Sequence, residues 1–218
     1  GNAPPVAGAV IMTPNPATEL TGIQCVVGDS SDPDGDNVAL SYVWYVNEAI
    51  VEGQTDATLS GEHYDKGDTV LCEVTAFDGE DSSEPEASKV VVVVVNTPPA
   101  LEGASIDPTE GSVQTPFTCV PGAAVDPDPG DIVTTTTGWL HDDAEVPGGI
   151  FDTLTPGELG PGTLRCVVTP NDGEEDGDPV TSTPATVLNE APSITSVLLG
   201  PQPATSSDTL TCTPGGWN

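Results

Sequence analysis

The sequence predicts an all-β protein made of β-sandwich modules in tandem, and three observations support this prediction. One pattern recurs at intervals of 94 and 93 residues, as Asn2-Ala-Pro-Pro, Asn96-Thr-Pro-Pro and Asn189-Glu-Ala-Pro. Repeats of this length are whole domains, because a module of about 90 residues can bury a core of its own. The chain also contains 24 Gly and 23 Pro and no long stretch of helix-forming residues. Finally, short segments alternate between apolar and polar residues, which is the period of a half-buried strand.

The repeats predict the domain boundaries. We expect a first module over residues 1–95, a second over residues 96–188, and the first strands of an incomplete third module over residues 189–218. No signal-peptide pattern is present and the sequence stops shortly after Cys212, so we expect a segment of a longer, mature protein. The linkers are short and contain proline, which restricts the backbone, so we expect the modules to be arranged end to end.

Alternation and turn residues predict the strands. In the first module, residues 42–46 and 69–75 alternate, and Lys89 leads into the valine run Val90–Val95. Clusters of Pro, Gly and Asp separate such segments at the spacing expected of about seven strands per module. We expect the valine run to be either a strand buried on both faces or an edge strand protected by a neighbouring module.

Two pairs of cysteines share one spacing. Cys25 and Cys72 are 47 residues apart, and so are Cys119 and Cys166. In an Ig-like sandwich the second and sixth strands face each other across the core, so this spacing predicts one disulfide in each module. A metal–thiolate site is the alternative, but the chain has no short Cys-x-x-Cys pair. Persistent disulfides predict an extracellular or cell-surface location.

Tryptophans accompany the predicted bridges. Trp44 and Trp139 follow the first cysteine of their module by 19 and 20 residues, on the next predicted strand, so we expect each to pack in the core against its disulfide. Cys212 has no partner in this sequence, and the register of the repeats would place its partner near position 259.

The charge of the chain limits its partners. Thirty-five acidic residues against three basic ones give a net charge of −32. Nucleic acid and anionic membranes are excluded as partners, because proteins bind both through Lys and Arg. Such a charge repels itself, so it indicates bound cations or a salty medium. No apolar segment is long enough to span a membrane.

Acidic clusters recur at equivalent positions of the two modules. Asp32-Pro-Asp-Gly-Asp36 begins seven residues after Cys25, and Asp126-Pro-Asp-Pro-Gly-Asp131 begins seven residues after Cys119. A second acidic cluster follows the sixth strand, where an aspartate stands six residues after the cysteine, at Asp78 and at Asp172. In an Ig-like sandwich both loops emerge at the end where the chain enters, so we expect them to converge beside the linker.

These clusters are candidate calcium sites. Calcium binds six to eight oxygen atoms, which can come from several loops. The alternative is that Asp-Pro-Asp-Gly is a common turn and that its carboxylates are only solvated. The candidate ligands are Asp32, Asp34, Asp36, Asp78, Asn96, Asp126, Asp128, Asp131 and Asp172.

Several segments resemble PKD-type and cadherin-like Ig-fold repeats of bacterial surface and secreted proteins: Gly28–Asp36, Leu40–Trp44, Gly67–Gly79 and Val95–Pro99. The resemblance covers both complete modules and the opening of the third. It implies stalks, spacers or adhesive arrays, and it marks the aspartates of the acidic loops as cation ligands. Two features depart from that family: Pro129 is inserted in the second loop, and Asn96 and Asn189 stand where cadherin linkers are more acidic.

Catalysis finds little support in the sequence. His63 and His141 are the only histidines, and they lie at different distances from the first cysteine of their modules. Paired carboxylates are plentiful, but glycosidases also need a cleft, and aromatic residues make up only 4% of the chain. We therefore expect no catalytic residues and no enzymatic activity.

The sequence thus predicts a non-catalytic structural repeat of an extracellular bacterial fibre, stalk or giant adhesin, with calcium at its junctions. The alternative is an accessory or carbohydrate-binding module of a secreted enzyme, which should present an exposed aromatic platform. We expect the partners to be copies of the chain or further modules of it. Thr134–Thr137 and the segments around Thr181 and Ala204 are candidate O-glycan acceptors, although threonine is also common in exposed strands.

Overall fold

The computed structural model describes residues 1–148, 151–191 and 193–217, with only the backbone described for Trp217. The described residues form Ig-like β-sandwiches and two single-turn 3₁₀ helices, so the predicted all-β fold class is confirmed. The chain divides into two compact units. One contains residues 1–103, 121–136 and 168–180, and the other contains residues 104–120, 137–167 and 181–218. Two acidic loops of the second sandwich therefore belong to the first unit.

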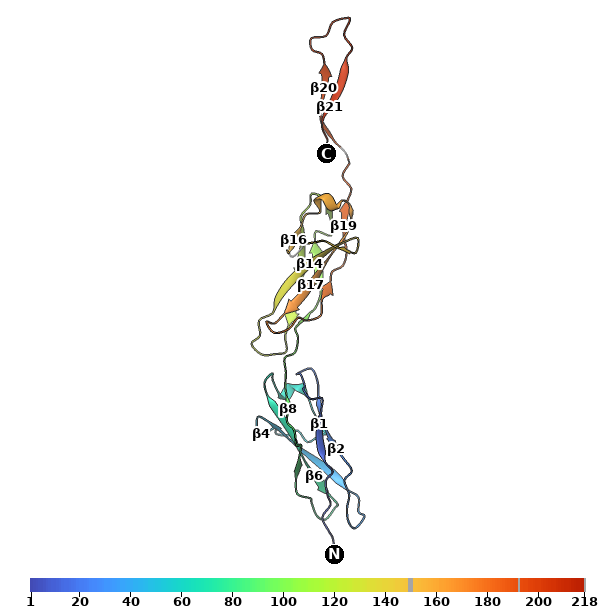
Figure 1. Cartoon of the computed structure of the whole chain (residues 1–218). Helices are drawn as coiled ribbons and strands as arrows, with labels where there is room; N and C mark the ends of the chain where they lie inside the picture. Colours follow the sequence, from blue (N-terminus) through green and yellow to red (C-terminus); the bar gives the residue numbers. More distant parts are fainter. Residues whose placement is uncertain (149–150, 192, 218) are drawn as a thin grey trace. The chain divides into compact units, whose positions relative to one another are not determined.

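The first sandwich consists of two sheets (Figure 1). One sheet has the order β1 (Val10–Thr13), β2 (Ile23–Val27) and β5 (Thr58–Leu59). The other has the order β4 (Ala49–Ile50), β3 (Ala39–Val46), β6 (Thr69–Phe77) and β7 (Glu86–Ala87), and β8 (Val92–Val93) also pairs with β6. The helix η1 (Gly61–His63) lies between β5 and β6.

Alternation in β6 forms the core of the first sandwich. Every second residue from Val70 to Ala76 is fully buried, as the period of two in the sequence predicts. Cys72, on this buried face, forms a disulfide with Cys25 of β2, with 6.2 Å between their Cα atoms. Trp44 lies directly opposite Cys72 on β3, is fully buried, and donates its indole N–H to the carbonyl of Asp56 at 2.9 Å. The bridge and the tryptophan thus share one core, as the sequence predicts.

The valine run differs from the prediction of a strand buried on both faces. Val92 and Val94 are buried, whereas Val91, Val93 and Val95 are exposed. Only Val92 and Val93 form a regular strand, which pairs with β6, and Val94 makes a parallel bridge to Ala17. One face of the run therefore packs on the core and the other faces solvent, because a sandwich covers each of its sheets on one side only.

The second sandwich repeats this architecture. One sheet has the order β10 (Ala104–Asp107), β12 (Phe117–Pro121) and β16 (Thr153–Leu154). The other has the order β11 (Glu110–Ser112), β19 (Ala185–Leu188), β17 (Gly162–Asn171), β14 (Thr134–His141) and β15 (Ala144–Glu145), and β18 (Val180–Thr181) also pairs with β17. A short pair joins β9 (Ala100–Leu101) to β13 (Ala124–Val125), and the helix η2 covers Gly157–Leu159.

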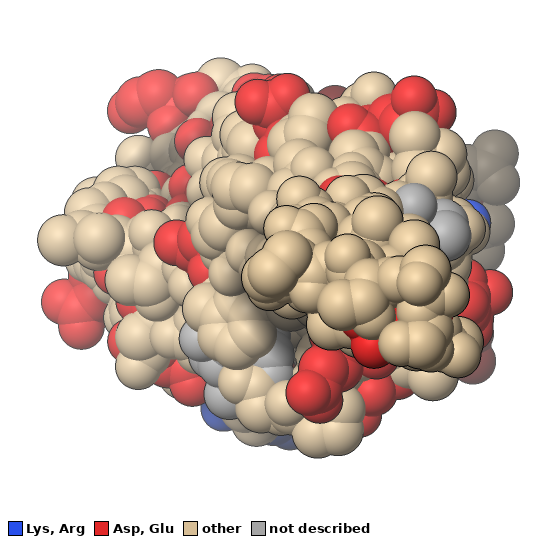
Figure 2. Space-filling view, turned by 90° about the horizontal axis from the view of Figure 1, so that it is seen from above, with Lys and Arg blue, Asp and Glu red and all other residues tan. Residues whose placement is uncertain are grey.

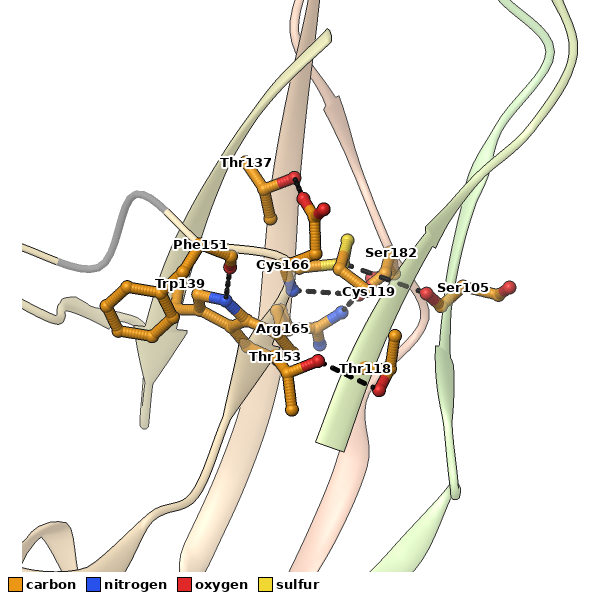
Figure 3. Close-up of a disulfide and its surroundings, with 11 residues drawn as sticks. Ser105, Thr118, Cys119, Thr137, Trp139, Phe151, Thr153, Arg165, Cys166 and Ser182 are labelled. Carbon is orange, nitrogen blue, oxygen red and sulfur yellow. Dashed lines mark hydrogen bonds between the residues drawn. A yellow bond between two sulfur atoms is a disulfide. The ribbon is translucent and has the colours of Figure 1, made fainter. Parts of the chain in front are cut away.

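The core of the second sandwich is built around its disulfide (Figure 3). Cys119 and Cys166 are bridged, with 6.0 Å between their Cα atoms. Trp139 is 1% exposed and donates its indole N–H to the carbonyl of Phe151 at 2.8 Å, which matches the bond of Trp44 in the first sandwich. Ser182 accepts the backbone N–H of Cys166 at 3.0 Å, so the polar groups around the bridge are satisfied locally.

The remaining described residues form a hairpin. Strands β20 (Ile194–Gly200) and β21 (Thr211–Trp217) pair in antiparallel register, with Leu199 opposite Cys212. Cys212 is exposed and is a free thiol. The predicted third module corresponds to this hairpin, and the predicted domain boundaries stay predictions. Among the described residues, no helix has the length and apolarity needed to cross a membrane.

Candidate cation site

The loop after β2 is organised by its own aspartate. Asp32 accepts the backbone N–H groups of Asp34 and Asp36 with one oxygen, Oδ1, at 2.8 and 3.2 Å. Gly35 makes the turn with φ +88°, a conformation that favours glycine. The local sequence Asp-Pro-Asp-Gly-Asp thus folds as the turn that the simpler interpretation predicts, and it leaves Oδ2 of Asp32 buried without a hydrogen-bond donor among the described residues.

The loop after β6 uses the same device. Asp78 accepts the backbone N–H groups of Glu80 and Asp81 at 2.7 and 2.8 Å, and these bonds lower the pKa of its carboxyl. Asp172, after β17, accepts those of Glu174 and Glu175, both at 2.7 Å. A side-chain bond from Asn96, together with these backbone bonds, lowers the pKa of Asp172 to about 2. Asp78 and Asp172 therefore stay ionised, because the backbone N–H groups of their own turns stabilise the charged form.

The asparagine of each linker binds the loop after the sixth strand. Asn2 donates its amide N–H to Asp78 and to Asp81, both at 3.0 Å. Asn96, one repeat later, donates its amide N–H to Asp172 at 2.8 Å. The predicted ligand Asn96 thus acts here as a hydrogen-bond donor, and its carbonyl oxygen is the only part of its side chain that could bind a cation.

The residue after each linker asparagine binds the other acidic loop. The backbone N–H of Ala3 donates to Asp34, and that of Thr97 donates to Asp128, both at 2.8 Å. The linker is therefore attached to both acidic loops in each repeat. We call this pair of bonds, from the asparagine side chain and from the next backbone N–H, the linker clamp.

Three aspartates gather in the loop after β13. One carboxylate oxygen from each of Asp126, Asp128 and Asp131 lies within 4.8 Å of the other two, and Asp128 is 2% exposed. In residues 1–148, 151–191 and 193–217, no second group of this kind meets the same distance, so Asp32, Asp34 and Asp36 are not gathered in that way. The structure thus brings together three of the predicted ligands.

Lys66 lies against this cluster. Its Nζ atom is 2.5 Å from an oxygen of Asp131, 3.1 Å from Glu174 and 3.8 Å from Asp128. It also donates to the side-chain carbonyl of Asn96 at 3.1 Å. These contacts, led by the bond to Asp131, raise the pKa of Lys66 above its ordinary value. All of these residues belong to the first compact unit, and the ammonium group is the counter-ion of the cluster.

Glu19 adds a fourth carboxylate. Its Oε1 accepts the backbone N–H of Lys66 at 2.6 Å, whereas its Oε2 is buried and has no donor among the described residues. Burial and the neighbouring Asp128 carboxyl raise the pKa of Glu19 to about 7. Two facing carboxyl groups with unpartnered oxygens share either a proton or a cation.

Sequence reasoning missed Lys66 and Glu19. The signal for Lys66 was present, because a chain with three basic residues and a net charge of −32 will surround each cation with carboxylates. Glu19 carries no motif, and only the fold brings it near Asp128. On the face viewed in Figure 2, Asp and Glu are scattered among uncharged residues.

The histidines do not form a catalytic arrangement. His141 lies 3.3 Å from the carbonyl of Gly160 and 3.8 Å from Asp142, and His63 ends the helix η1. The hollows described on the surface are lined by neither histidine nor cysteine. The chemistry that the described site offers is cation binding by hard oxygen atoms.

Comparisons with known proteins find similarity to solved structures only. No protein-family model matches the chain, and no curated protein matches it. Similar structures include two fibronectin type III domains of chicken tenascin, with 11% identity over 83% of this chain and 99% of that chain and a TM-score of 0.39. The FN1–FN3 domains of chicken CNTN1 share 12% identity over 98% of this chain and 76% of that chain, with a TM-score of 0.33. A Ca²⁺-stabilised, ice-binding adhesin of an Antarctic bacterium shares 13% identity over 100% of this chain and 58% of that chain, with a TM-score of 0.34. At such identities and TM-scores, the similarity carries no argument about what this chain binds or does.

Proposed function

We propose that the chain is a non-catalytic structural repeat of an extracellular bacterial fibre, stalk or adhesin, of the PKD-type or cadherin-like kind. The observation that carries this proposal is the linker clamp. Asn2 and Ala3 donate these two bonds to the acidic loops of the first module, and Asn96 and Thr97, 94 residues later, donate them to the acidic loops of the second. A repeated attachment of the linker to the next module is the device that a stiff spacer needs, because it removes the freedom of the connecting chain.

The disulfides support the extracellular part of the proposal. Each sandwich has few aromatic residues and is closed by one bridge over 47 residues. Such bridges persist in oxidising compartments and are rare in the cytosol.

The alternative, a carbohydrate-binding module, is less well supported. A sugar platform needs several exposed aromatic rings side by side. Trp44, Trp139 and Tyr64 are buried in the cores, and the exposed phenylalanines, Phe77 and Phe151, lie one in each sandwich. Tyr42 and Tyr45 are partly buried, so Phe77 and Phe151 are the only exposed aromatic residues among the described side chains.

The proposed calcium site is the first acidic loop, Asp32–Asp36. Asp32, Asp34 and Asp36 make no ion pair with a basic side chain in the described part of the chain, and Oδ2 of Asp32 is buried and unpartnered. We expect weak binding, with a Kd on the order of 10⁻⁴ to 10⁻³ M as in other extracellular modules. A chelator should lower the melting temperature of the wild type but not that of Asp32→Asn, and an equal melting temperature with and without chelator in the wild type would remove calcium from the proposal.

Small-angle X-ray scattering of the 218-residue protein tests the structural function. A strand of ten residues spans about 33 Å, so we expect each module to add about 35 Å to an extended particle. The radius of gyration should then exceed the value of about 17 Å for one compact domain of this length. A compact particle, or hydrolytic activity lost on replacing His63 or His141, would contradict the proposal and favour a secreted enzyme.

A further inference from the structure

We propose that the pocket formed by Asn96, Asp128, Asp131 and Glu174 is a binding site for the ammonium group of Lys66, which takes the place of a divalent metal ion beside the aspartate cluster. We call it the ammonium pocket. The inference concerns this pocket alone, and it stands whether or not the chain is a structural repeat.

Each N–H donor of the Lys66 ammonium group has a hydrogen-bond acceptor. An ammonium group has three N–H donors. Nζ of Lys66 has Asp131 at 2.5 Å, Asn96 at 3.1 Å and Glu174 at 3.1 Å as acceptors, and Asp128 lies at 3.8 Å. These acceptors come from three separate segments of the first compact unit, so the ammonium group connects loops that are distant in sequence.

Burial of Asp128 is a second observation that favours a cation here, beside the proton that it can share with Glu19. Its side chain is 1% exposed, its Oδ2 accepts only the backbone N–H of Thr97, and its Oδ1 meets no donor in the described residues. An unpartnered carboxylate out of water costs several kcal/mol unless a positive charge compensates it. Lys66 brings that charge, and it makes the only ion pair with Asp128 in the described part of the chain.

Lys66 and a metal ion compete for the same carboxylates. Calcium needs six to eight oxygens at 2.3–2.6 Å, and Asp131, one of the three gathered ligands, is already bound by Lys66. A second cation at that distance would repel the ammonium group, so an ion that uses Asp131 as a ligand competes with Lys66. The lysine is part of the same chain and therefore competes at a high effective concentration.

The lysine distinguishes this pocket from the other acidic loops. In the second module the corresponding turn is Gly160-Pro161-Gly162, which has no lysine. The segment from the start of the 3₁₀ helix to the second cysteine is two residues shorter there than in the first module. Lys66 is thus a feature of one repeat and not of the repeated pattern. We infer that repeats with such a lysine are held without metal.

Calcium titration of two lysine variants tests this inference. Lys66→Met removes the ammonium group but keeps most of the aliphatic chain, and Lys89→Met is the matched control because Lys89 is exposed. In isothermal titration calorimetry we expect Lys66→Met to bind one more Ca²⁺ per chain than the wild type and than Lys89→Met, with a Kd on the order of 10⁻⁴ to 10⁻³ M. Adding Asp131→Asn to Lys66→Met should abolish the additional ion.

Equal calcium stoichiometry in the wild type and in folded Lys66→Met would overturn the proposal. So would an additional ion that survives Asp131→Asn, because it would bind elsewhere. If Lys66→Met fails to fold, amine labelling of the wild type, read by mass spectrometry, decides the question. We expect Lys66 to react several-fold more slowly than Lys89, with or without millimolar Ca²⁺. Equal labelling rates, or release of Lys66 by Ca²⁺, would overturn the proposal.

Discussion

Tyr64 joins two segments of the first sandwich through one side-chain hydrogen bond. It is 3% exposed and donates its hydroxyl to the backbone carbonyl of Thr21. Burial raises its pKa above 10.0. A carbonyl beside a buried ring keeps part of its desolvation cost when it loses its donor, so this bond should contribute about as much as an ordinary protein hydrogen bond.

Replacing Tyr64 with Phe should lower the free energy of unfolding by about 1 kcal/mol, because the carbonyl of Thr21 is left without a donor. The wild type should also lose stability as pH rises above 10. Its folded-state pKa exceeds the unfolded value of 10.0, so the contribution is complete below pH 10 and disappears as pH rises through the folded-state pKa. Urea unfolding between pH 7 and alkaline pH measures both effects, with Tyr42→Phe as the control. An identical stability and an identical alkaline slope in Tyr64→Phe would contradict this account.

Residues with a fixed spacing could be predicted, and residues that act through tertiary proximity could not. The bridged cysteines, Trp44 and Trp139 occupy core positions of the sandwiches. The pattern of the neighbouring residues predicts that their side chains point into the core. Lys66 contacts Asp131 and Glu174 across 65 and 108 residues of sequence, and no pattern relates them. Asn96 is a predicted cation ligand, but its amide nitrogen donates to Asp172 and its carbonyl oxygen accepts from Lys66.

At the scale of elements, the disulfides join the two sheets of each sandwich. Both close loops of 47 residues, so the chain-entropy model predicts the same stabilisation for both, about 4 kcal/mol. Small domains with few aromatic residues depend on such bridges because their apolar cores are limited.

Replacing both cysteines of one bridge with Ala should destabilise that sandwich by about 4 kcal/mol and leave the other nearly unchanged. The pairs to compare are Cys25→Ala with Cys72→Ala, and Cys119→Ala with Cys166→Ala. Calorimetric melting of each variant measures the effect, because each variant should show one shifted transition and one unshifted transition. A loss below about 1 kcal/mol in either variant, or equal shifts of both transitions, would contradict this assignment.

Long alternating strands could be predicted, but short ones could not. Residues 42–46 and 69–75 lie inside β3 and β6, and in β6 the buried residues alternate strictly with more exposed ones. The valine run has no such alternation, and its buried face is decided by pairing with β6 and by the bridge to Ala17. Two-residue strands such as β4 and β16 leave no periodic signal in a sequence.

At the scale of the whole molecule, the proposed function requires stiff junctions between modules. The linker clamp attaches Asn96 and Thr97 to Asp172 and Asp128, and the ammonium pocket adds Lys66 to the same loops. The proposed function requires that length increases with the number of modules, which is the property that a stalk or fibre uses. The sequence predicts the repeat and the acidic loops, whereas the bonds of the clamp follow only from the folded structure.

Residual dipolar couplings of the backbone amides test this stiffness most directly. If the clamp fixes the junction, the couplings of both sandwiches in the wild type should fit one alignment tensor of common magnitude and orientation. Asn96→Ala combined with Asp128→Ala should remove the clamp and yield two tensors of unequal magnitude, whereas the matched changes Asn2→Ala and Asp34→Ala should not. Two unequal tensors in the wild type, or one common tensor that survives loss of the clamp, would contradict the claim that these bonds make the chain a stiff structural repeat.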